Sequence, residues 1–321
     1  MFLMRSVSYI KIQKAFMLLA LFCAGVFYSD AAVAQDNTLG DLVVGLSDGF
    51  LTLPSLLEMI SRLLGAGFII FGIYKFRDHV DRPSQVPMFD AIRMMIAGAF
   101  FLTLPDMVNY LISTFGFQEI EDISNSGYNM SAGDNEGGLT VDGMLTSLAN
   151  DLRPAMMYAF YIFSYVAGLI VFMIAIYRIT RGFDQGARGP LGMGTFAHFV
   201  TAAVLLSLPQ ALAVFSTTIF GDSDVKTFAV ISEDAGMTAE LAERAHAIMG
   251  AVETFMIIIG IISFIRGWFI LKSAADGNGQ ATTLSAFSHI VAGVVAVNIG
   301  PFINAVQQTF GLDPANGILF Q

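Results

Sequence analysis

The sequence predicts an all-α, polytopic membrane protein, in which a cleaved signal peptide precedes six transmembrane helices that form three parallel helical-hairpin repeats. Hydrophobic residues make up 55% of the chain and charged residues only 13%, whereas about a quarter of a soluble domain is charged. The apolar residues fall into blocks of about 20, the length that crosses roughly 30 Å of hydrocarbon. Three of these blocks also lead into a proline that is followed about ten residues later by Phe-Gly.

Residues 1–34 have the pattern of a signal peptide. Three basic residues precede an apolar run from Ala15 to Tyr28, and small residues follow it. A basic segment, a short apolar run and a small-x-small site are typical of a leader that is removed on export. We expect cleavage before Gln35, and an uncleaved first membrane anchor is the alternative. The only cysteine, Cys23, lies in the leader, so the mature chain would carry no thiol.

The repeats are indicated by three apolar runs that each lead into a proline, with Phe-Gly about ten residues later. The three prolines are Pro105, Pro209 and Pro301. About 30 residues before each proline, an earlier apolar block ends in a base, which is Lys75, Arg178 or Lys272. The repeating unit is therefore a helix, a short polar loop and a second helix.

The expected spans are helices because every backbone polar group in hydrocarbon needs a partner within its own segment. Since proline lacks the N–H group and bends a helix, we expect a shared kink near the three prolines. The six spans cover residues 53–74, 91–113, 154–177, 199–219, 248–271 and 286–309. The corresponding divisions begin with a signal peptide at 1–34 and an outer segment at 35–52. The three hairpins cover 53–116, 153–221 and 248–311. The acidic outer loops between them cover 117–152 and 222–247, the second with an amphipathic helix, and an outer tail covers 312–321.

The basic residues predict the orientation. Nine of them lie in or beside the loops within hairpins, and three lie in the segments between hairpins. Basic residues concentrate on the cytoplasmic side of a membrane, so we expect these loops on the cytoplasmic face of a bacterial inner membrane and both mature termini in the periplasm. The outer segments are acidic, which does not suit nucleic acid. The expected partners are the lipid bilayer, other membrane subunits and copies of the chain itself.

Three ionisable residues fall inside the expected spans: Glu58, Arg62 and Glu253. Such residues are candidates for function because they are costly to hold in hydrocarbon. Glu58 and Arg62 stand four residues apart, so they share a helix face and can neutralise one another. Alternatively, both lie near the outer interface, where an arginine reaches water. Glu253 lies at a comparable depth in the third copy, with no partner nearby in its own helix.

A basic residue or a histidine opens the second helix of each hairpin: Arg93, His198 and His289. These residues could form a ring if the hairpins pack around one axis, or they could anchor the helices at the inner membrane surface. Four histidines and no mature cysteine are few ligands for a metal site. The chain also has no Gly-Lys-Ser/Thr phosphate loop and no convergent acid, base and nucleophile. We expect no catalytic residues, no metal and no cofactor.

Short segments of the hairpins carry a resemblance to a known family: residues 65–75, residues 101–105 and the turn at Pro190-Leu191, with its counterpart at Pro87-Met88. They resemble the small inner-membrane components of type IVB secretion and conjugation systems, the IcmC/DotE and IcmD/DotP family of the Dot/Icm apparatus. The resemblance covers the membrane part of each hairpin and not the outer loops. It implies a non-enzymatic role in a multiprotein secretion channel, with no catalytic residues to assign.

A second hypothesis is a small-solute or ion transporter or channel with three parallel two-helix repeats, similar in plan to mitochondrial carriers. Those carriers place a proline, acid and base signature at the end of each first helix, whereas the prolines here fall in the second helices. A transporter also gathers polar groups near the middle of the membrane. The middle residues of these spans are mostly apolar, which favours the first hypothesis.

Overall fold

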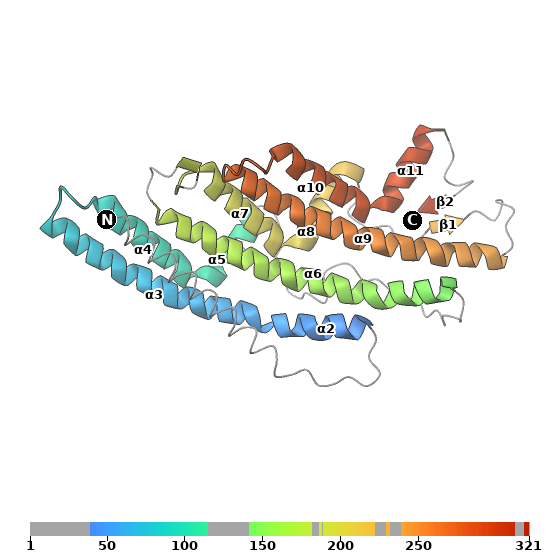
Figure 1. The fold of residues 1–321 in the computed structure, drawn as a ribbon, viewed down its shortest axis with the longest axis horizontal. Helices are drawn as coiled ribbons and strands as arrows, with labels where there is room; N and C mark the ends of the chain where they lie inside the picture. Colours follow the sequence, from blue (N-terminus) through green and yellow to red (C-terminus); the bar gives the residue numbers. More distant parts are fainter. Residues whose placement is uncertain are drawn as a thin grey trace. The chain divides into compact units, whose positions relative to one another are not determined.

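The structure is a computed structural model that describes residues 39–114, 141–181, 186–187, 189–221, 229–231, 239–311 and 318–320. The expected signal peptide and most of the first acidic loop lie outside the described residues. Helices make up most of the described chain (Figure 1). Their length and hydropathy are those of a helical membrane protein.

Among the described residues, three helical stretches are long and apolar enough to cross a membrane, and they lie in residues 39–81, 143–179 and 248–275. The long helices of these stretches are α3 (Thr52–Asp81), α6 (Val141–Ile179) and α9 (Ala239–Ala275). They run in the same direction in Figure 1, and α6 lies between the other two. A further helix, α2 (Leu39–Phe50), precedes α3 and packs along α6.

Each long helix is followed by two short helices that meet at a sharp bend. The pairs are α4 (Met88–Leu102) with α5 (Leu104–Thr114), α7 (Met193–Leu206) with α8 (Leu208–Phe220), and α10 (Thr283–Val297) with α11 (Ile299–Thr309). The bends are 88°, 97° and 89°, so the expected kink is present in all three pairs. We call α3–α5, α6–α8 and α9–α11 the first, second and third hairpins.

These bends correct the expectation that residues 91–113, 199–219 and 286–309 would each form one helix. Each segment is two helices, because a proline cannot donate the backbone hydrogen bond of its turn and restricts the residue before it. Three helices are clear candidates for spans, and the number rises to six among the described residues if each bent pair is one span.

Two of the long helices begin well before their expected spans. Helix α6 starts at Val141, inside the expected loop at 117–152, and α9 starts at Ala239, inside the expected loop at 222–247. The amphipathic segment of that second loop is therefore continuous with the third long helix. Hydropathy marks the part of a helix that suits hydrocarbon, and it does not mark where the helix begins. Even Pro154 lies within α6.

A small antiparallel sheet joins two segments outside the helices. Strand β1 (Ala229–Ile231) pairs with β2 (Ile318–Phe320), with Ala229 opposite Phe320 and Ile231 opposite Ile318. The pairing connects the segment before α9 to the segment after α11.

The buried core is centred on the second and third hairpins. Of the most apolar stretch of each long helix, 56% is buried in the second hairpin and 50% in the third. The most apolar 18-residue stretch of residues 39–81 is only 17% buried. The largest fully buried side chains include Phe264 of α9, Leu169 of α6 and Leu205 of α7.

Candidate functional site

The three bends share the same local chemistry. One residue separates the two short helices of each pair. Its backbone N–H donates to the carbonyl four residues earlier, at 3.1, 3.1 and 3.0 Å in the first, second and third hairpins. The side chain of the same residue donates to that same carbonyl, at 2.9, 2.7 and 2.9 Å. These bend residues are Thr103, Ser207 and Asn298. A polar side chain therefore closes the end of α4, α7 and α10 in each hairpin.

A serine on the long helix bonds the carbonyl that the proline leaves without a donor. In the second hairpin, Pro209 cannot donate to the carbonyl of Leu205, and the buried Ser164 hydroxyl donates to it at 2.6 Å. In the first hairpin, the buried Ser61 hydroxyl donates to the carbonyl of Phe101 at the same distance. A buried carbonyl without a partner is costly, so these two bonds hold each bend against its long helix.

The third bend is bonded to the second hairpin. The Ser216 hydroxyl of α8 donates to the side-chain oxygen of Asn298 at 2.7 Å, and both residues are buried. The amide nitrogen of Asn298 is already used at its own bend. One side chain thus links two hairpins.

The first and second hairpins meet through Arg93 of α4. Its guanidinium donates to the carbonyl of Arg181, just after α6, and also pairs with Asp90 on its own helix. Lys75 at the end of the α3 apolar block lies 3.5 Å from Asp90. The base that opens α4 therefore reaches the end of the next long helix.

The second and third hairpins meet through an ion pair between the buried Arg178 and the half-buried Asp276. The Arg178 guanidinium donates to both carboxylate oxygens of Asp276, at 2.6 and 2.8 Å. This two-pronged geometry is the strong form of an ion pair. The ring of His198 lies 3.8 Å from the same carboxylate. A Cβ at Gly194 would collide with the Asp276 carboxylate. Glycine at this position therefore allows the start of α7 to pack against the turn that follows α9.

The three residues expected to open the second helices occupy two different positions. His198 and His289 stand nine residues before their bend residues, and each bonds through Nδ1 to the carbonyl four residues earlier, at 2.6 and 2.9 Å. Arg93 stands ten residues before Thr103 and bonds elsewhere. Arg93 and His198 lie at two successive contacts between hairpins, whereas His289 is half-buried in the third hairpin.

The charged residues of the expected spans lie in contrasting surroundings. Glu58 and Arg62 are 4.0 Å apart, with side chains that are 34% and 63% exposed. Glu253 is only 4% exposed, and its Oε1 has no hydrogen-bond partner. The charge of Arg153 on α6 acts on it, but the two side chains form no ion pair, and Nε and Nη2 of Arg153 also have no hydrogen-bond partner. The opposite charge that acts on Glu253 is therefore on another helix.

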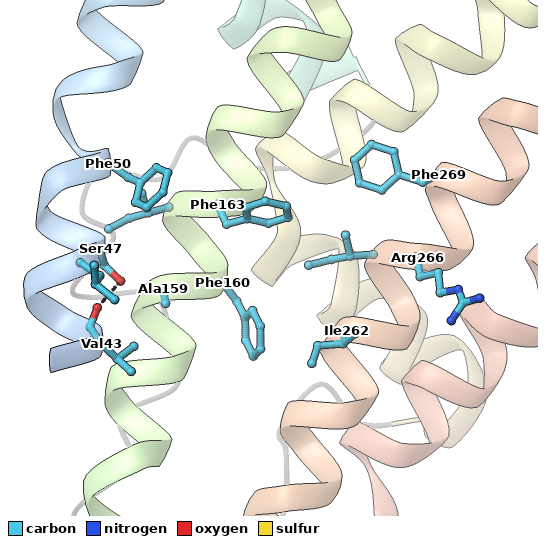
Figure 2. Close-up of a pocket in the computed structure, with 12 residues that line it drawn as sticks. Val43, Ser47, Phe50, Ala159, Phe160, Phe163, Ile262, Arg266 and Phe269 are labelled. Atoms are coloured by element: carbon cyan, nitrogen blue, oxygen red, sulfur yellow. Dashed lines mark hydrogen bonds between the residues drawn. The ribbon is translucent and has the colours of Figure 1, made fainter. Parts of the chain in front are cut away.

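An apolar cavity of about 560 Å³ lies between α2, α6 and α9. Figure 2 shows Phe50, Phe163 and Phe269 around it, with Arg266 on α9. The hydroxyl of Ser47 donates to the carbonyl of Val43 at 2.7 Å and so adds little polarity. Binding sites for small polar ligands have a few convergent polar groups, and this lining offers a hydrocarbon surface instead.

Four residues of this site are not among those that the sequence predicts: Ser61, Ser164, Asp276 and Arg153. A signal for the serines was present, because Ser61 precedes Lys75 by the same number of residues as Ser164 precedes Arg178. Asp276 also follows Gly260 by the same number of residues as Asp81 follows Gly65, but it lies in a turn beyond the expected span. Among the described residues, no group of three or more histidine, aspartate or glutamate side chains is placed to hold a metal ion.

Comparisons with known protein families, with curated proteins and with solved structures found no match for this chain. The resemblance to the IcmC/DotE and IcmD/DotP family therefore rests on the short hairpin segments alone.

Proposed function

We propose that this chain is a non-enzymatic subunit of a bacterial type IV secretion or conjugation apparatus of the IVB, Dot/Icm-like class, and that it assembles with other membrane subunits. The observation that carries the proposal is the unequal burial of the long helices. The apolar stretch that includes α3 is 17% buried, against 56% and 50% for the other two. An apolar helix face that its own chain leaves open is available to a neighbouring membrane protein.

The buried polar groups support a structural role. The hydroxyls of Ser61 and Ser164 bond backbone carbonyls at the bends, and Ser216 bonds Asn298. Arg178 is paired with Asp276. These groups fasten helices to one another, as expected of a scaffold.

The proposed topology has six spans in the bacterial inner membrane, with the hairpin loops in the cytoplasm and both termini in the periplasm after signal cleavage. It counts each bent pair as one span. A phosphatase that is active only after export, fused after Gly127, should be active, whereas the same fusion after Gly279 should be inactive. The reverse pattern of activities would refute this orientation.

The functional test is purification of the tagged full-length chain from detergent-solubilised membranes of its own host. We expect secretion ATPases, a coupling protein or other secretion membrane subunits to be recovered with it and to be encoded nearby. Recovery of the chain alone, with its gene among metabolic genes, would contradict the proposal.

The second candidate is a small-solute or ion transporter or channel. The observation that favours it is the buried Glu253, which has an unbonded oxygen, together with three broken helices, because transporters place ion sites at broken helices. Ion flux into vesicles that contain the purified chain, abolished by Glu253→Gln and kept in Arg62→Gln, would support this function. Absence of flux in the unaltered chain would remove it.

A further inference from the structure

The contact between the first and second hairpins is equivalent to the contact between the second and third. In the first contact, Arg93 at the start of α4 reaches Arg181, just beyond α6. In the second, His198 at the start of α7 reaches Asp276, just beyond α9. In each case, the second helix of one hairpin packs on the long helix of the next.

In each hairpin, one glycine of the long helix packs on the second helix of the same hairpin: Gly65, Gly168 or Gly260. Counting from this glycine identifies five equivalent positions on the side of the long helix that faces the preceding hairpin. We call these positions the leading face. In α9 they are all buried, and in α6 they are buried or half-buried. They are Thr254, Ile258, Ile261, Ile265 and Trp268 in α9, and Ile162, Val166, Leu169, Met173 and Ile176 in α6.

The leading face of α3 has the same apolar pattern, but no hairpin precedes α3 in the part of the chain that the structure describes. Its residues are Met59, Leu63, Ala66, Ile70 and Ile73, and all five are exposed. The contrast is large at the last position, where Ile73 is 56% exposed, Ile176 1% and Trp268 7%. The spacing along the helix places the five residues on one side.

The opposite end of the molecule has a matching open surface on α10 and α11, which we call the trailing face. The position six residues before the bend residue is fully buried in the first and second hairpins, where it is Ala97 and Thr201. In the third hairpin it is Ala292, which is exposed. Four residues after it, Ala211 is fully buried, whereas Phe302 is 40% exposed. The third hairpin thus leaves open both positions that the second hairpin buries, whereas the first hairpin buries Ala97 and half-buries Met107.

We infer that copies of this chain join head to tail, with the trailing face of one copy packed on the leading face of the next. The new contact would continue the two contacts already present within the chain. Such a contact uses two different surfaces, so it generates closed rings or open filaments rather than twofold-symmetric dimers. The inference deepens the proposed function and rests on it for the role of the resulting assembly.

The charges at the two faces also match. Asp81 follows Gly65 by the same number of residues as Asp276 follows Gly260. His289 occupies in α10 the position of His198 in α7. The contact of His198 with Asp276, at 3.8 Å, would therefore be repeated between His289 of one copy and Asp81 of the next. Lipid tails could cover the apolar residues of α3, but they offer nothing to this pair.

The test is disulfide crosslinking in native membranes, starting from a chain with Cys23→Ala. Within the chain, the Thr201 hydroxyl donates to the carbonyl of Trp268 at 3.5 Å. The equivalent positions between copies are Ala292 and Ile73. The full-length double variant Ala292→Cys with Ile73→Cys should give a ladder of dimers and larger species on oxidation, and each single variant should give no ladder.

The matched control is Ala292→Cys with Phe71→Cys. Phe71 is exposed, as are the equivalent Ile174 and Arg266, so this position lies outside the leading face. We expect at least tenfold less crosslinked product from this pair. Equal products from the two pairs, or no ladder from Ile73→Cys, would overturn the inference, while recovery of secretion subunits with the same variant would leave the proposed function standing.

A charge exchange in the crosslinking variant tests the polar contact. Asp81→His or His289→Asp alone should lower the ladder severalfold, and the two together should restore it. Asp81 is exposed and His289 is half-buried, so thermal unfolding of the purified chain should change little and would reveal a variant that fails to fold. Loss of the ladder without restoration in a folded double variant would refute the His289 and Asp81 pairing.

Discussion

The first hairpin differs from the second and third in what surrounds it, although its internal packing is the same. Gly65, Gly168 and Gly260 are each so close to their second helix that an added Cβ would lie 2.8 Å from a neighbouring atom. Burial of the long helices nevertheless falls from about half to 17% in the first hairpin. The difference teaches that the two helices of a hairpin pack together by themselves, whereas the leading face of a long helix is buried only where another hairpin precedes it.

The largest effect is expected where the second and third hairpins meet. Arg178→Ala would leave the half-buried Asp276 without its two-pronged partner and with only the His198 ring 3.8 Å away, and breaking a buried ion pair costs up to about 3–5 kcal/mol. The only tryptophan, Trp268, packs against Phe215 and Phe264, so its fluorescence during thermal unfolding in detergent measures the loss. Arg62→Ala, which removes an exposed pair, should cost about 0–1 kcal/mol. Equal melting temperatures for the two variants would contradict the importance of the buried pair.

The comparison between hairpins is tested most directly by one substitution at two equivalent positions. Ile176→Ala removes a buried side chain and should destabilise the chain by about 2 kcal/mol or more. Ile73→Ala alters an exposed side chain, so the purified monomer should change by no more than about 0.5 kcal/mol. Thermal unfolding of both variants in detergent checks the difference. A similar loss at Ile73 would show that the first hairpin is buried in the monomer.

Packing within a hairpin should respond equally in the first and second copies. Gly65→Ala and Gly168→Ala both force a Cβ against the second helix, and overpacking of this kind costs about 1–3 kcal/mol. Gly67→Ala is the matched control, because nothing lies within 4 Å of a Cβ at that position. Melting temperatures of the three variants give the comparison, and a smaller effect at Gly65 than at Gly168 would mean that the first hairpin packs more loosely.

The smallest effect is expected at the bends. Ser164→Ala removes the hydroxyl that donates to Leu205, and such bonds in membrane proteins contribute about 0.6 kcal/mol on average and about 1.7 at most. Ser61→Ala should cost the same, since its bond to Phe101 has the same length. Ser55→Ala, an exposed serine on α3, is the control. Amide hydrogen exchange near the bends, measured in detergent, should rise in the first two variants only.

Much of the helical order could be predicted from the sequence because hydropathy and proline act locally. The kinks near Pro105, Pro209 and Pro301 are an example. Their sharpness could not be predicted, because it also depends on the polar bend residues and on serines that are about 40 residues distant. Likewise, Glu253 could be recognised as an acid within an expected span, but Arg153, whose charge acts on it, precedes the expected span on another helix.

The bends also determine how much membrane the second helices can cross. Helices α4, α7 and α10 contain 15, 14 and 15 residues, which is about 22 Å at 1.5 Å per residue, against a hydrocarbon layer of about 30 Å. A short span is accommodated by local thinning of the bilayer, by flanking polar residues or by oligomerisation. Bilayer thickness should therefore influence where this protein gathers in a membrane, and thinner lipid regions should favour it.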